Sequence, residues 1–178
     1  VYVLNDPYHG GTHLPDVTVV TPVFDEAAAA ILFYVGSRGH HADIGGVTPG
    51  SMPPFSTRID EEGVQIDNVK LVDAGRLCES EMLALLSSGE HPSRNPQQNL
   101  ADLKAQIAAN EKGVQELRKM VAQFGLDVVQ AYMRHVQDNA EESVRRVITA
   151  LKDGAFELKL DNGSAIRVAI RVDHARRE

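Results

Sequence analysis

The stretch that decides the fold runs from Asn99 to Asp127 and reads NLADLKAQIAANEKGVQELRKMVAQFGLD. Its apolar residues recur three or four positions apart, which is the spacing of one face of an α-helix. These residues form an apolar seam: Leu100, Leu103, Ile107, Val114, Leu117, Val121 and Phe124. Gly125 is a natural helix stop, and Asp127 can cap a following helix. We therefore expect one long helix that ends at Gly125.

The residues after Asp127 repeat the same helical spacing. They carry a second seam, made of Val129, Tyr132, Val136, Ala140, Val144, Val147 and Leu151. No proline interrupts the segment from Gln97 to Lys152. Two long helices joined by so short a link predict an antiparallel helical hairpin over residues 96–152. Beyond it, two alternating segments flank Asp161-Asn162-Gly163, which predicts a β-hairpin over residues 153–178.

The first 95 residues have a different composition, since all eight prolines lie within residues 1–96. Two runs rich in β-branched and aromatic residues, 16–24 and 31–38, predict strands. Residues 63–73 alternate enough for a third extended segment, and residues 79–88 predict a short helix. The expected fold class is therefore α+β, with mixed β segments and loops over 1–95, then the helical hairpin, then the β-hairpin. We expect residues 1–178 to form one partial domain, an internal fragment of a longer protein.

Composition excludes several classes of protein. The net charge is −7 with no basic stripe, so a nucleic-acid partner is not expected. No apolar run approaches the ~18 residues of a membrane span. Cys78 is the single cysteine and cannot form an internal disulfide, which fits a reducing, cytoplasmic compartment.

Two short polar loops concentrate imidazoles, carboxylates and glycines. The first, NDPYHGGTHLPD, spans residues 5–16, and the second, GSRGHHADIGG, spans residues 36–46. Each adjoins an expected strand, so both can open on one sheet edge if those strands are neighbours. Imidazole and carboxylate together suit Zn²⁺, Mn²⁺ or Fe²⁺. In the alternative interpretation the aspartates cap turns, and the glycines permit positive φ or approach an anion.

A polar row follows the edge of the first helical seam. Asp102, Gln106 and Asn110 are spaced four residues apart, and Asn110 falls within the seam itself. Such a row is either a solvated face or a functional one. The alanines around it would let another group approach the helix closely.

Three long stretches resemble the hydantoinase B / 5-oxoprolinase family, and in particular its B-type part. They are LNDPYHGGTHLPDVTVVTPVF, FYVGSRGHHADIGGVTPGSMPP and NLADLKAQIAANEKGVQELRKMVAQFGLDVVQAYMRHVQ. The resemblance implies ATP-dependent opening of 5-oxo-L-proline to L-glutamate, a reaction of glutathione metabolism. An A-type domain or subunit would bind ATP with Mg²⁺ and phosphorylate the lactam oxygen. The B-type part would complete the hydrolysis and carry a divalent metal (Zn, Mn or Fe).

The resemblance also suggests roles for particular residues. The expected metal ligands or orienting groups are Asp6, His13, Asp16, His41 and Asp43, with His40 as an alternative to His41. The expected catalytic residues are His40, His41, Asp102 and Asn110. The implied partners are the A-type part and a small lactam, in an oligomer.

Two other readings stay open. One is an N-methylhydantoinase B-type subunit that acts on hydantoins, and the other is a scaffold that docks the A-type part through its helices. No P-loop motif of the form GxxxxGK[ST] occurs, so this chain alone is expected to be inactive.

Overall fold

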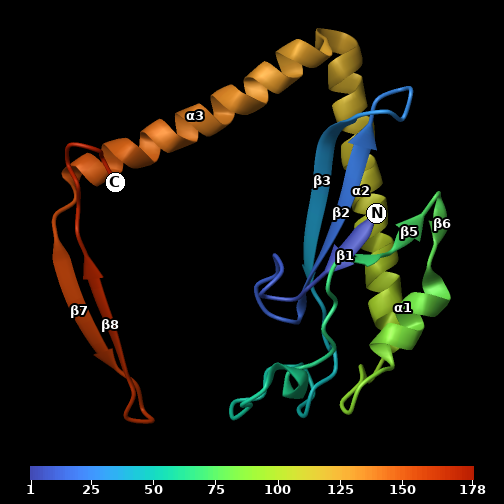
Figure 1. The fold of residues 1–178 in the computed structure, drawn as a ribbon, viewed down its shortest axis with the longest axis horizontal. Coiled ribbons are helices and arrows are strands. Elements are labelled where there is room, and N and C mark those ends of the chain that lie inside the picture. The colour runs from blue at the N-terminus through green and yellow to red at the C-terminus, as the bar shows by residue number, and fades with distance from the viewer. The chain divides into compact units, whose positions relative to one another are not determined.

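The computed structural model describes all 178 residues. The chain divides into two compact units, Val1–Lys119 and Met120–Glu178, which are described separately (Figure 1). Neither unit holds a helix with both the length and the apolar character that a membrane span requires.

The first unit is built on a four-stranded antiparallel sheet with the strand order β3-β2-β1-β4. Its strands are β1 (Tyr2–Leu4), β2 (Asp16–Phe24), β3 (Ile31–His40) and β4 (Val69–Lys70). A short 3-10 helix, Ile59–Glu61, and a small hairpin of β5 (Val72–Asp73) and β6 (Arg76–Leu77) complete its extended part. The strands expected at 16–24 and 31–38 are therefore confirmed, and they are paired neighbours.

Strand β2 alternates between a buried face and a partly exposed face, because successive side chains of a strand point to opposite sides. Val17 and Val19 are fully buried, whereas Asp16 and Thr18 are partly exposed. The buried face packs against the helical part of the unit. The other face carries the polar side chains that matter for the site.

Two helices belong to the first unit, α1 (Glu79–Leu86) and most of α2 (Pro96–Phe124). Asn95 caps α2, since its Oδ1 accepts a hydrogen bond from the backbone N–H of Gln98 at 3.2 Å. Pro96 suits the first helical position, where an N–H would have no partner within the helix. Helix α2 runs along β2 and β3 (Figure 1). The buried core is formed by Val3, Leu14, Val17, Val19, Ile44, Ile66, Leu71, Met82, Leu86, Leu100 and Leu103.

The second unit contains helix α3 (Leu126–Ala150) and a two-stranded hairpin of β7 (Gly154–Lys159) and β8 (Ala165–Ile170). Gly125 precedes α3 with a φ of 86°, a value that favours glycine. Gly163 turns the hairpin with a φ of 84°. The expected helix end at Gly125 and the expected β-hairpin are both confirmed, as is the α+β fold class.

The two long helices expected over residues 96–152 are present as α2 and α3. The apolar seam of α3 is exposed, since Tyr132 is 68% exposed and Val136 is 67% exposed. The seam of α2 is buried at Leu100 and Leu103, where it packs into the core beneath the sheet. The spacing of apolar residues reveals which face of a helix is apolar, but not which element covers that face.

Candidate metal centre

The register of β2 and β3 places Asp16 directly opposite His40 at the end of the strand pair. The Nδ1 atom of His40 lies 2.9 Å from Oδ1 of Asp16, and the Nδ1 atom of His13 lies 3.4 Å from Oδ2. The two imidazole rings are 5.4 Å apart between centroids. Ligand atoms from these three residues all lie within 4.8 Å of one another. We call this group the His13–Asp16–His40 cluster.

The electrostatic setting keeps the carboxylate of this cluster ionised. The hydrogen bond with His40, helped by the nearby His13, lowers the pKa of Asp16 below its usual range. The hydroxyl of Thr12 lies 3.4 Å from Oδ2 and can donate to it. Arg38 donates to Thr12 and Thr18, so a guanidinium lies on the same strand pair as the cluster.

Asp6 does not join this cluster but belongs to a separate one. The Nδ1 atom of His9 lies 3.1 Å from Asp6 and 3.3 Å from Asp67. The other carboxylate oxygen of Asp6 accepts the backbone N–H of Tyr8 at 2.9 Å, which closes a turn. Asp67 is distant in sequence, and no spacing pattern links it to the first loop.

His41 is buried, and its ring contacts helix α2. Its Nδ1 lies 3.0 Å from the amide nitrogen of Asn99, and its Nε2 lies 3.3 Å from Oε1 of Gln106. Burial lowers the pKa of His41, which favours a neutral ring that accepts from Asn99 and donates to Gln106. Because both ring nitrogens are engaged, the structure does not bring His41 to the cluster as a ligand.

Asp43 organises the second loop instead of joining the cluster. Its carboxylate accepts hydrogen bonds from the backbone N–H groups of Gly45, Gly50 and Arg94, and from the guanidinium of Arg94 at 2.8 Å. Partial burial raises the pKa of Asp43, but these hydrogen bonds together outweigh it and hold the pKa below its usual range. This pattern is that of a loop-closing carboxylate.

The polar row of α2 mainly attaches the helix to the sheet. The amide of Asn110, itself buried, donates to the backbone carbonyls of Val19 at 3.0 Å and Val35 at 3.3 Å. The amide of Gln106 donates to the carbonyls of Val17 and Ser37 at 3.0 and 3.3 Å.

Asp102 is the exception in this row. It is partly exposed and accepts a hydrogen bond from Gln98 one turn earlier in α2. The row is therefore more than a solvated face, although its contacts by themselves imply anchoring. Asn99 was not part of the expected row, and its seven-residue spacing from Gln106 on one helix face is the signal that pairs the two residues.

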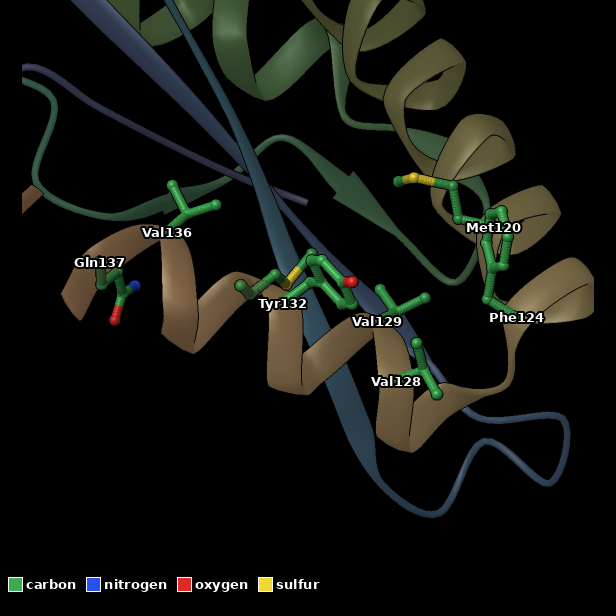
Figure 2. Close-up of a pocket in the computed structure, with 8 residues that line it drawn as sticks. Met120, Phe124, Val128, Val129, Tyr132, Val136 and Gln137 are labelled. Atoms are coloured by element: carbon green, nitrogen blue, oxygen red, sulfur yellow. The ribbon is translucent and has the colours of Figure 1, made fainter. Parts of the chain in front are cut away.

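An apolar hollow lies within the second unit. It has a volume of about 760 Å³ and is lined by apolar side chains from the end of α2 and the start of α3 (Figure 2). Met120, Phe124, Val128, Tyr132 and Val136 line it in Figure 2, with Gln137 at one end. The phenol of Tyr132 is the one ionisable group in its lining, which holds no carboxylate, imidazole or thiol, so we place the candidate chemistry at the histidine and aspartate clusters.

Comparison with known proteins identifies the family. The family model described as Hydantoinase B/oxoprolinase matches residues 1–178. The chain therefore belongs to the hydantoinase B/oxoprolinase family.

Curated relatives include 5-oxoprolinase 1 of Arabidopsis thaliana, which is 43% identical over 97% of this chain. The 5-oxoprolinase of Dictyostelium discoideum is 44% identical over 99% of it. The matches cover only 15% and 14% of those two proteins, so the chain spans a small part of their length.

Solved structures share the fold. The ATP-dependent caprolactamase from Pseudomonas jessenii superposes with a TM-score of 0.77 at 27% identity, covering 97% of this chain and 30% of that one. A nucleotide-free acetone carboxylase superposes with a TM-score of 0.73 at 21% identity, covering 88% of this chain and 20% of that one, and indicates the fold alone.

Proposed function

We propose that this chain is the hydrolytic part of an ATP-dependent cyclic-amide hydrolase that opens 5-oxo-L-proline to L-glutamate. The observation that carries the proposal is the His13–Asp16–His40 cluster, which offers a water-activating site in a chain similar to two 5-oxoprolinases. The proposal includes a cytoplasmic location and a role in glutathione metabolism.

The cluster has the donors that a catalytic metal needs. Two imidazole nitrogens and one carboxylate oxygen suit Zn²⁺, Mn²⁺ or Fe²⁺, and three protein ligands leave a position open. Such an ion polarises a carbonyl or phosphoryl oxygen and lowers the pKa of water enough to make it a nucleophile near neutral pH. His13 and His40 are partly exposed, so a substrate could reach this side of the strand pair.

In the proposal, Asp16 orients the two imidazoles of the cluster, and His41 holds the backbone beside it. Asp16 lies between the two imidazoles, so one ionised carboxylate orients both rings. His41 anchors the end of β3 to α2 through Gln106 and Asn99, and its backbone N–H donates to the carbonyl of Pro15 at 2.8 Å. This anchoring would hold the residues next to His41 and Pro15, which are His40 and Asp16, at a fixed separation.

The ATP-dependent step is assigned to a partner, the A-type domain or subunit, where ATP and Mg²⁺ would act. A lactam is a poor electrophile because its nitrogen lone pair is delocalised into the carbonyl. Phosphorylation of the lactam oxygen would prepare the ring carbon for attack by water at the cluster. The similar caprolactamase is ATP-dependent, which supports an ATP-dependent step in the proposed reaction.

The test uses the full-length protein together with its A-type part. Wild type, His13→Ala, His40→Ala and the control His135→Ala are dialysed, and their divalent metal content is measured. Ring opening of 5-oxoproline and of hydantoins is then assayed with and without ATP. His135 is an exposed histidine on α3, so its loss should change neither result.

We expect His13→Ala and His40→Ala to lose both the metal and ATP-dependent activity, with activity falling at least ~100-fold. A wild-type protein that is metal-free yet active would overturn the metal assignment. Activity on hydantoins but not on 5-oxoproline would change the substrate.

A further inference from the structure

A second, smaller hollow of about 410 Å³ lies directly beside the His13–Asp16–His40 cluster. His13 belongs to the wall of this hollow as well as to the cluster. Met52, Pro53 and Pro54 also line it. Its volume is within the ~300–1,000 Å³ range of small-molecule sites, toward the lower end. A ligand in this hollow would therefore be small and would lie next to His13.

The loop that contains Met52, Pro53 and Pro54 is held in place. The hydroxyl of Ser51, a buried residue, donates to the carbonyl of Gly45 at 2.6 Å and accepts the backbone N–H of Ile44 at 2.8 Å. One residue earlier, the backbone N–H of Gly50 donates to Asp43 at 3.1 Å. The two prolines restrict the following backbone further. The hollow is thus largely formed before a ligand arrives, which reduces the ordering cost of binding.

The lining has an aliphatic side and one acidic group. The pyrrolidine rings of Pro53 and Pro54 and the side chain of Met52 offer surfaces suited to methylene groups. Glu62 supplies the acid, and its Oε1 accepts a hydrogen bond from the hydroxyl of Ser56 at 2.9 Å. The second oxygen of Glu62 makes no hydrogen bond within the chain, so it is free to accept an N–H from a ligand.

From this arrangement we propose that the hollow is the ring-binding subsite for the cyclic amide. Glu62 accepts the ring N–H, Met52–Pro54 pack against the ring methylenes, and the carbonyl side of the ring is directed to His13. Any carboxylate on the ring points away from Glu62, because like charges repel. The wall at Met52 then sets which ring substituents fit. This inference rests on the proposed function for its substrate class, and it adds the residues that select the substrate.

The test measures binding and metal content separately in the full-length protein with its A-type part. The probes are 5-oxo-L-proline and its N-methyl derivative, which lacks the ring N–H. Glu62→Ala removes the acceptor, and Glu26→Ala, in the exposed turn between β2 and β3, is its matched control. Met52→Trp fills the hollow, and Met52→Leu preserves its approximate size.

For 5-oxoproline we expect Glu62→Ala and Met52→Trp to raise KM about tenfold or more, with metal content unchanged. The two controls should keep the wild-type KM. Wild type should bind the N-methyl derivative about tenfold more weakly than 5-oxoproline, and Glu62→Ala should lose that preference.

Unchanged KM values in both variants, with the metal retained, would overturn the subsite and leave the proposed function standing. Loss of metal in Glu62→Ala would also overturn it, since Glu62 would then belong to the metal centre. A wild type with neither metal nor ring-opening activity would instead defeat the proposed function itself.

Discussion

The two units of the chain contain similar fractions of apolar residues but use them in opposite ways. In Val1–Lys119 the apolar side chains gather in a buried core between the sheet and its helices. In Met120–Glu178 Val129 is the single buried side chain, and every residue of β7 and β8 is exposed. An amphipathic pattern is therefore enough to form a helix or hairpin, but stability from burial needs a second surface to pack against. Substitutions matched across the two units test this difference.

The largest difference is expected for leucine side chains. Leu103 on α2 is 1% exposed, whereas Leu158 on β7 is 49% exposed. Leu103→Ala should lower the free energy of unfolding by about 2–5 kcal/mol, because it removes packed methyl groups and leaves a cavity. Leu158→Ala should cost less than about 1 kcal/mol. Urea denaturation monitored by circular dichroism provides the comparison, and equal costs would refute the contrast between the units.

A smaller difference is expected for asparagine. Asn110→Ala leaves the buried carbonyls of Val19 and Val35 without this donor, which should cost about 1–3 kcal/mol of unfolding free energy. The matched change Asn139→Ala, on the exposed surface of α3, should cost less than about 0.5 kcal/mol. The same urea experiment measures both. If Asn110→Ala were as mild as its control, the polar row would be a solvated face after all.

The smallest effect concerns pH. The pKa of Asp43 is lowered because hydrogen bonds outweigh partial burial, and the pKa of Glu142 is lowered by its hydrogen bonds with Arg177 and Arg146. A carboxylate whose folded pKa is depressed adds stability above its unfolded pKa, about 3.9 for aspartate. That stability is lost as pH falls through the folded pKa.

Asp43→Asn should therefore lower the thermal unfolding midpoint at neutral pH. The difference in midpoint from wild type should become smaller as the pH falls toward 2.5. Glu142→Gln should cause a smaller loss of stability at neutral pH, and high salt should abolish that loss. The ion pairs of Glu142 with Arg146 and Arg177 are exposed, so salt screens them. Thermal unfolding midpoints between pH 2.5 and 7, at low and high salt, measure both profiles. A salt-sensitive Asp43 contribution as small as that of Glu142 would contradict the assignment of Asp43 as a loop-closing group.

The candidate site was only partly accessible to sequence reasoning. Crowding of histidines and aspartates indicated two loops on neighbouring strands, and Asp16 does meet His40 and His13. The pattern could not show that Asp6 pairs with His9 and Asp67, or that Asp43 closes its own loop. Those outcomes depend on the path of each loop, which short-range spacing does not encode.

By itself, the sequence determined the secondary-structure elements, because the interactions that form them are local. Helical spacing, Gly125 and the turn at Gly163 act over a few residues and need no distant partner. Only the tertiary structure decided which face each element buries. His40, the last residue of β3, is exposed, whereas His41 just after the strand is buried and contacts Asn99 and Gln106 of α2. The seam of α2 packs beneath the sheet, while that of α3 stays exposed. Burial depends on contacts between residues far apart in the chain, and no local pattern specifies those contacts.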